Sequence, residues 1–397
     1  MFKRQKKALK FFILLLILST LIYSRIKVDS LIPTWSHPVG HLSMHNREMT
    51  LNKAKCLPVR NIAFIKTHKT GSSTVSNILL NFGLANNLTA ALPNFLKGHP
   101  YYNYITKPNE HFVKEMICPL TDGRQEYNLL FYHCVYNKTA FRSIMPENTV
   151  YISILREPFQ QFLSSFFYYR IDISLVKDFP DLNNSMSIYS FLSSPYNFTK
   201  EENHFTYTRN KQAEDLGFRE EHLRNNETLK QYLLGLEKDF LLVMIMEYFE
   251  ESLLLLRRAL CWEMEDIIYI PNNVNKKKEK LTFDEEYIQS HRRFSVLDYI
   301  VYDHFLKIFE EKLNSQDESF KAELDHFKRV LNLVQLGCAT GNDVWVNESV
   351  WHQSFVVTQE RCRLMTMGEL DSLDLLFEVQ GTKRTLNSTH SVRTLLY

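Results

Sequence analysis

Four short apolar runs, each followed by a polar turn, are the feature that most limits the folds open to this chain. The runs span residues 61–65, 129–132, 149–155 and 240–246. Apolar residues at helical spacing follow over 72–82, 159–169 and 250–260. Repetition of strand then helix predicts an α/β fold, in which helices flank a central, mainly parallel sheet. The charged stretch 276–330 predicts a solvated helical region.

Chemically useful side chains stand where these runs end. Lys66, His133, Arg156 and Glu247 each follow the last residue of a predicted strand or lie at its end. In open parallel sheets, ligands bind beyond the carboxyl ends of the strands. We therefore expect a functional site at this edge of the sheet.

The segment after the first run has the composition of an anion site. It lies between a predicted strand and a predicted helix, so the unpaired N–H groups of the helix N-terminus can face an anion. Gly71 permits a tight turn, and Lys66 and Lys69 add positive charge. The first glycine of the Walker A pattern is missing and Lys69 precedes Gly71, which disfavours a nucleotide triphosphatase. An ordinary capped helix after a basic turn is the alternative.

A second anion site is predicted at Arg156. Ser164 follows eight residues later, about two turns into the next helical pattern. A guanidinium and a hydroxyl can together bind a phosphate, with arginine as a bidentate donor. An arginine at a strand end can also be a surface ion pair, and the neighbouring lysine loop favours the anion site.

The first sixty residues predict a membrane anchor. A basic tail over 1–7 precedes a nearly continuous apolar segment over 8–24, and a stretch with scattered prolines over 25–60 resembles a stem. More cations before the segment than after it place the N-terminus in the cytosol. We expect a type II membrane protein whose body, residues 61–397, is lumenal. A cleavable signal peptide is the alternative, disfavoured because no small-residue cleavage site follows.

Charge and cysteine content limit the classes of ligand that this chain is expected to bind. Taking the five cations of residues 1–10 from the 47 Lys and Arg leaves 42 against 45 acidic side chains, so no basic field indicates nucleic acid. The six cysteines include no C-x-x-C pair, and no His, Asp or Glu cluster has the spacing of metal ligands. We predict no metal site and one to three disulfides in an oxidising lumen, with fifteen pairings open.

Glycosylation sequons agree with a lumenal body. The predicted sites are Asn87, Asn137, Asn183, Asn197, Asn226, Asn347 and Asn387.

The sequences of these segments resemble those of one family of Golgi sulfotransferases. KTHKTGSST (66–74), SILREP (153–158) with SSFFYY (164–169), and EYFEESLLLLRR (247–258) are similar to motifs of the galactose-3-O-sulfotransferase family. Cys362-Arg363-Leu364 and Gly368-Glu369-Leu370 extend the resemblance, which runs from about residue 61 to about residue 380.

The resemblance implies a P-loop-like sulfotransferase fold, a Golgi membrane location and a definite reaction. The enzyme would move a sulfuryl group from 3′-phosphoadenosine 5′-phosphosulfate (PAPS) to the 3-hydroxyl of a terminal β-galactose. The acceptor would be a glycolipid, such as galactosylceramide, or a glycan; a homodimer is possible. No metal is required. The residues expected around the 5′-phosphosulfate are Lys66, Thr67, Thr70, Gly71, Ser72, Ser73 and Thr74, and those around the 3′-phosphate are Arg156 and Ser164.

The chemical step needs two further roles. Lys69, with Lys66 second, is expected to neutralise charge on the bridging oxygen as the bond to sulfur breaks. His68 or His133 is expected to accept the proton of the sugar hydroxyl, and Glu247 is a weaker candidate.

Two other functional classes are alternatives. The first is an inert lumenal protein that binds a glycan or nucleotide; it is favoured by Cys134, displaced from the place before His133 that is usual in the family. The second, a kinase, would need metal-holding acids and a glycine loop that we do not find.

Overall fold

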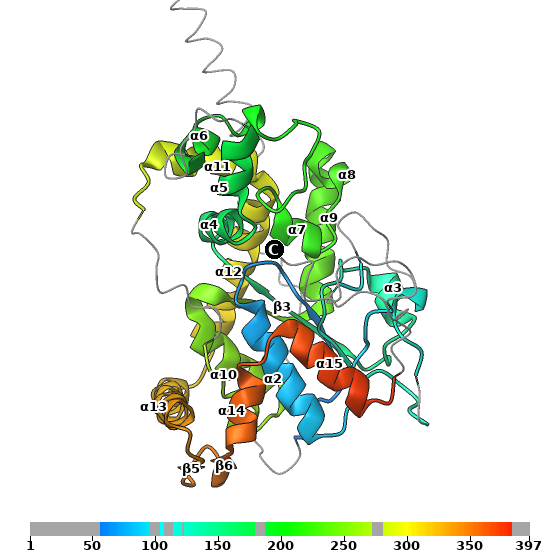
Figure 1. Ribbon diagram of the computed structural model, residues 1–397, viewed down its shortest axis with the longest axis vertical. Helices are drawn as coiled ribbons and strands as arrows, with labels where there is room; N and C mark the ends of the chain where they lie inside the picture. The colour runs from blue at the N-terminus through cyan, green and yellow to red at the C-terminus, as the bar shows by residue number, and fades with distance from the viewer. Residues whose placement is uncertain are drawn as a thin grey trace, which may run out of the picture. The chain divides into compact units, whose positions relative to one another are not determined.

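The computed structural model describes residues 56–94, 104–106, 114–120, 123–178, 187–271 and 281–382 (Figure 1). All of them belong to one compact unit that begins at Cys56. The expected tail (1–7), membrane span (8–24) and most of the stem (25–60) lie outside the described residues. Within the described ranges, no helix is both long enough and apolar enough to cross a bilayer.

A four-stranded parallel sheet forms the centre of this unit, as the sequence predicts. Its strands are β1 (Ile62–Ile65), β2 (Leu129–Leu130), β3 (Val150–Leu155) and β4 (Phe240–Ile245), in the order β2-β1-β3-β4. β1 is completely buried and β3 and β4 almost so, which explains why these strands read as continuous apolar runs and not as alternating ones.

Helices flank the sheet, which confirms the α/β class. Figure 1 shows α2 (Ser72–Ala85) and α15 (Glu369–Val379) in front of it; α14 (Gln359–Met365) packs against α2, and α10 (Phe249–Leu260) packs against β4. The remaining helices are α3 (Lys138–Arg142), α4 (Pro158–Tyr168), α5 (Ile171–Asp178), α6 (Ser187–Ser193), α7 (Lys211–Asp215), α8 (Glu220–Arg224), α9 (Asn226–Asp239), α11 (Glu285–Phe294), α12 (Val296–Asn314) and α13 (Ser319–Thr340). A separate antiparallel pair joins β5 (Val344–Val346) to β6 (Phe355–Val357).

The prediction of a solvated helical region at 276–330 is wrong for α12. This helix packs against β4, and Leu297, Val301, Phe305 and Phe309 on it are buried in the main core. Apart from the buried Asp298, its acidic and lysine residues are exposed, so a high charge content concealed an amphipathic core helix.

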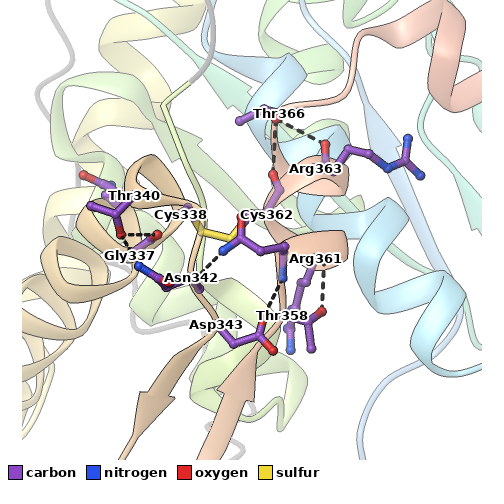
Figure 2. Close-up of a disulfide and its surroundings, with 12 residues drawn as sticks. Gly337, Cys338, Thr340, Asn342, Asp343, Thr358, Arg361, Cys362, Arg363 and Thr366 are labelled. Atoms are coloured by element: carbon purple, nitrogen blue, oxygen red, sulfur yellow. Dashed lines mark hydrogen bonds between the residues drawn. A yellow bond between two sulfur atoms is a disulfide. The ribbon is translucent and has the colours of Figure 1, made fainter.

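Two disulfides fasten the unit. Cys56, just before β1, is bonded to Cys261 at the end of α10, and Cys338 on α13 is bonded to Cys362 on α14. Figure 2 shows the second bond, which holds the two helices together above the β5–β6 hairpin. Cys118 and Cys134 are free thiols.

Four of the seven predicted sequons have exposed asparagines: Asn87, Asn197, Asn226 and Asn347. Asn137 is half-buried, and its side chain accepts a hydrogen bond from the Ala140 N–H at the start of α3. Asn183 and Asn387 lie outside the described residues. A glycan on Asn137 would attach at a half-buried side chain, unlike one on the four exposed asparagines.

Removing each disulfide should lower the free energy of unfolding, by an amount that grows with the logarithm of the length of the loop that it closes. Replacing Cys338 and Cys362 by serine, a separation of 24 residues, should cost about 3 kcal/mol. Opening the bond between Cys56 and Cys261, a separation of 205 residues, should cost about 5 kcal/mol. Urea unfolding followed by circular dichroism measures both, with Cys118→Ser as the control. If the two disulfide variants and the Cys118→Ser control had equal urea midpoints, the prediction would be contradicted.

Candidate active site

The loop between β1 and α2 has the tight geometry expected of an anion site. Lys69 and Gly71 both have left-handed backbone angles, with φ of 63° and 78°. At Gly71 a β-carbon would lie 2.5 Å from the Met246 sulfur, so a larger residue there would strain the backbone and make the flexible Met246 side chain shift. Gly71 is also the N-cap of α2 and has no side chain with which to cap the helix. The N-terminal N–H groups of α2 are thus not capped by that residue.

The hydroxyls of this loop mostly fix its shape. The Thr67 and Thr70 side-chain oxygens are 2.8 Å apart, and the Thr67 hydroxyl donates to the Ile154 carbonyl on β3. The Ser72 hydroxyl donates to the Thr67 carbonyl at 2.6 Å. Thr74 is buried, and its backbone N–H donates to the Gly71 carbonyl at 3.0 Å. A bound anion would therefore meet a loop that is already rigid.

The two loops singled out in the sequence meet in space. Arg156 follows β3, and its Nη1 donates to the Lys69 carbonyl at 3.3 Å. On α4, the Gln161 side chain donates to the His68 carbonyl at 3.1 Å. Ser164 lies half-buried on the same helix, and its hydroxyl bonds to no other described side chain. Lysine, arginine and helix N-terminus thus gather at one edge of the sheet.

Lys69 projects from the loop toward an exposed aromatic ring. Its Nζ lies 3.3 Å from the centre of the Tyr168 ring, whose residue is 62% exposed. Burial, together with the nearby Lys66 and Arg156, lowers the pKa of Lys69 to about 8, although Glu369 opposes the shift. The Lys69 ammonium therefore loses its proton more readily than that of an ordinary lysine. It lies where an anionic group could bind.

Lys66 is placed differently from Lys69. Its Nζ is buried and lies 3.2 Å from the Ser76 hydroxyl, 3.4 Å from the Ser73 hydroxyl and 3.0 Å from Glu369 Oε1. The Ser73 hydroxyl donates to the same Glu369 oxygen at 2.6 Å. Lys66 and Ser73 thus face a carboxylate from the C-terminal part of the chain.

The two candidate histidines are stacked, with ring centres 4.1 Å apart. The backbone N–H and Nδ1 of His68 both donate to Asp215 Oδ2, at 2.8 and 2.7 Å, and its Nε2 lies 2.7 Å from the Tyr104 hydroxyl. Nδ1 of His133 lies 3.2 Å from the Lys66 carbonyl, which can only accept. The neutral His133 ring therefore has its proton on Nδ1 and its lone pair on Nε2. The lone pair of His68 is also on Nε2, but there it faces the Tyr104 hydroxyl.

Both imidazoles are neutral near neutral pH. Burial is the largest cause that lowers the pKa of His68 well below its ordinary value, and the Lys211 charge acts in the same direction. Burial and the neighbouring His68 lower the pKa of His133 in the same way. A neutral imidazole can accept a proton, which is what a general base needs.

Several residues of this cluster escaped the sequence analysis. Asp215 accepts from Lys211 Nζ through its second oxygen at 3.1 Å, and both side chains are buried. Lys211 and Asp215 line a small pocket together with Tyr104, His68 and His133. No motif marks Tyr104 or Asp215, and Glu369 stood in a recognised motif with no role assigned. Only the fold brings these positions together.

Glu247 is occupied by structural contacts. Its two carboxylate oxygens accept from the Glu157 backbone N–H at 2.9 Å and from the Tyr302 hydroxyl at 3.1 Å. This geometry supports a capping role and not that of a proton acceptor. Among the described residues, no group of three or more His, Cys, Asp and Glu side chains could hold a metal ion.

Fold and site together define an α/β protein in which a lysine loop, an arginine and a helix N-terminus, candidates for an anion site, meet at the carboxyl ends of a parallel sheet with two histidines beside them. Comparison with known proteins gives the family. The model of the galactose-3-O-sulfotransferase family matches residues 1–353, so the chain belongs to that family.

Curated relatives agree. Galactose-3-O-sulfotransferase 2 of Sus scrofa is 34% identical over 263 residues, which are 65% of this chain and 63% of that protein. Galactose-3-O-sulfotransferase 3 of Mus musculus is 35% identical over 254 residues, 62% of this chain and 56% of its own length. Galactosylceramide sulfotransferase of Homo sapiens is 32% identical over 263 residues, 66% of this chain and 59% of that protein. The chain thus aligns with less than two thirds of the length of each of these three.

The lowered pKa of Lys69 predicts a pH limit. Lys69 is charged below pH 8 and neutral above it, so kcat/KM for an anionic donor should fall as the pH rises through about 8. In Lys69→Arg the side chain stays charged at higher pH, so kcat/KM should no longer fall above pH 8. This holds even if kcat/KM of the variant is lower at every pH. Initial rates across the pH range, at limiting donor, give the measurement. The same limb in Lys69→Arg would mean that another group titrates.

Proposed function

We propose that this protein transfers a sulfuryl group from PAPS to the 3-hydroxyl of a terminal β-galactose on a glycolipid, such as galactosylceramide, or on a glycan. Family membership supports the reaction class. The contact between the Arg156 guanidinium and the Lys69 carbonyl carries the proposal further, because it joins two anion-binding elements that can hold the two phosphates of one donor.

The donor would lie along the edge formed by β1 and β3. Its phosphosulfate would face the N-terminus of α2 and the Lys69 ammonium, where N–H groups and positive charge favour an anion. Its 3′-phosphate would face Arg156, with the Ser164 hydroxyl two turns along α4 as a second donor. Thr67, Thr70 and Ser72 act mainly by keeping the loop in shape.

Transfer would be an in-line displacement. The galactose 3-oxygen forms a bond to sulfur while the bond from sulfur to the 5′-phosphate oxygen breaks, and Lys69 neutralises the charge left on that oxygen. The hydroxyl proton passes to a histidine. We assign it to His133 Nε2, because His68 Nε2 already faces the Tyr104 hydroxyl at 2.7 Å. Asp215 and Lys211 would hold His68 beside it.

We also propose that the chain is a single-pass type II protein of the Golgi membrane, anchored by residues 8–24 with a lumenal catalytic body. The two disulfides support an oxidising compartment. The alternative of an inert binding protein rested on Cys134, which is buried next to His133 and leaves Lys69 and both histidines in place.

Transfer itself is the first test. The full-length chain in detergent should sulfate galactosylceramide or lactosamine from PAPS, with linkage analysis placing the sulfate on the 3-oxygen. Lys69→Ala should reduce kcat by about 10²-fold, as expected for removal of one charge-stabilising group. Lys321→Ala, an exposed lysine of α13, should behave as the native chain. Binding of the desulfated donor without turnover on any galactoside would instead select the inert protein.

Exchange of each histidine identifies the base. His133→Asn keeps an amide donor near the Lys66 carbonyl but removes Nε2, so kcat should fall by about 10²–10⁴-fold. His68→Asn keeps a donor for Asp215 and should lose less. Saturating kinetics with both substrates, together with thermal unfolding as a check on folding, make the comparison. A greater loss in His68→Asn would move the base to His68.

A further inference from the structure

We propose that an N-linked glycan on Asn347 packs its first sugar against the indole ring of Trp345, on the outer face of the β5–β6 hairpin. The inference assigns a ligand of definite chemistry, N-acetylglucosamine, to an exposed aromatic side chain that the proposed reaction does not use. It rests on the proposed function only for the lumenal position of the body, because such glycans are added to secreted and lumenal chains.

The hairpin extends beyond its two strands. β5 pairs with β6 in antiparallel register, with Val346 opposite Phe355. An isolated antiparallel bridge between Ser349 and His352 continues the same register three residues further along. Asn347 is the residue after β5, so it lies inside this hairpin and between two points where the chains pair.

Trp345 and Asn347 lie on one face of the hairpin. Side chains along a strand point to opposite faces in turn, so residues two positions apart share a face. Val344 and Val346 are buried in the main core, whereas Trp345 between them is 72% exposed and Asn347 is exposed as well. The rise of an extended strand places their Cα atoms about 7 Å apart. A sugar joined to the Asn347 amide therefore begins within reach of the indole ring.

The exposure of Trp345 is unusual for its residue type. Tryptophan is highly buried on average, because its ring has a large apolar surface. Trp262 is 3% exposed and Trp351 is half-buried. One face of N-acetylglucosamine carries mainly C–H bonds, and packing that face on the indole removes apolar surface of both partners from water. Of the seven sequons, Asn347 is the one with an aromatic residue two positions earlier.

The second strand leaves room for the sugar. Val356 lies opposite Trp345, and continuation of the same register places Ser354 opposite Asn347. Ser354 is exposed and has a short side chain. A two-stranded hairpin is marginally stable by itself, so a sugar packed on its outer face adds to the stability that the buried inner face provides.

Attachment of the glycan is a displacement at carbon 1 of the first sugar. The donor is a lipid-linked oligosaccharide diphosphate, which the secretory pathway supplies together with its transferase. The Asn347 amide nitrogen forms a bond to carbon 1 and loses one proton, while the bond from carbon 1 to the diphosphate oxygen breaks. Ser349 completes the sequon that this transfer requires.

Hydroxyl-radical footprinting of the full-length chain, produced in cells that attach N-linked glycans, tests the contact. Mass spectrometry measures the occupancy of each sequon and the oxidation rate of each tryptophan. Trp345 in the native chain should be oxidised about threefold more slowly than in Asn347→Gln, because the sugar covers its ring. Trimming the native glycans to their first N-acetylglucosamine should preserve this protection. Asn226→Gln, which removes a different exposed sequon, should preserve it too.

Three results would overturn the inference: an unoccupied Asn347, equal oxidation of Trp345 in the native chain and in Asn347→Gln, or loss of protection when the glycans are trimmed to the first sugar. Should Asn347→Gln fail to fold, enzymatic removal of the whole glycan from the folded native chain gives the same comparison. Sulfate transfer is measured on the same samples. Protection of Trp345 without transfer would refute the proposed function alone, and transfer without protection would refute this inference alone.

Discussion

The pairing of β1 with β3 is the constraint on which the site depends. The parallel register places Ile65 opposite Ser153, and the Ser153 hydroxyl donates to the Ile65 carbonyl at 2.8 Å. The chain therefore leaves both strands at the same edge, with the lysine loop after one and Arg156 after the other. Every later contact between the two loops follows from this register, because a shift of one residue would turn the side chains to the opposite face.

Buried charge gives the site its rigidity. Asp215 is completely enclosed, yet it accepts from both N–H groups of His68 and from Lys211. Removing water from an ion pair is costly, and its hydrogen bonds must compensate. In return, the Asp215 carboxylate fixes two features of the site: the position of the loop backbone at His68 and the tautomer of the His68 ring. A site held in this way need not reorganise when charge develops.

The sequence predicts the local parts of this arrangement and not its remote ones. Buried parallel strands read as continuous apolar runs, and Gly71 followed by hydroxyls marks the loop before α2, so β1, β3 and their loops were predictable. Tyr104, Asp215 and Glu369 come from separate segments and reach the histidines only through the fold. The high charge content of residues 276–330 led to a wrong prediction of a solvated helix at α12. A helix that is polar on one face can still bury phenylalanines on the other.

The bond between Cys338 and Cys362 has a consequence beyond stability. It fastens α14, and the Asn77 side chain of α2 donates to the carbonyls of Met365 and Met367 just before α15 begins. The covalent tether thus ends a few residues from Glu369. In a reducing compartment the loops after β1 and β3 would still form, because these strands pair directly. The segment that leads to α15 would lose its covalent anchor, so oxidation of this bond would fix how the C-terminal helices sit against α2 and not only how strongly they resist unfolding.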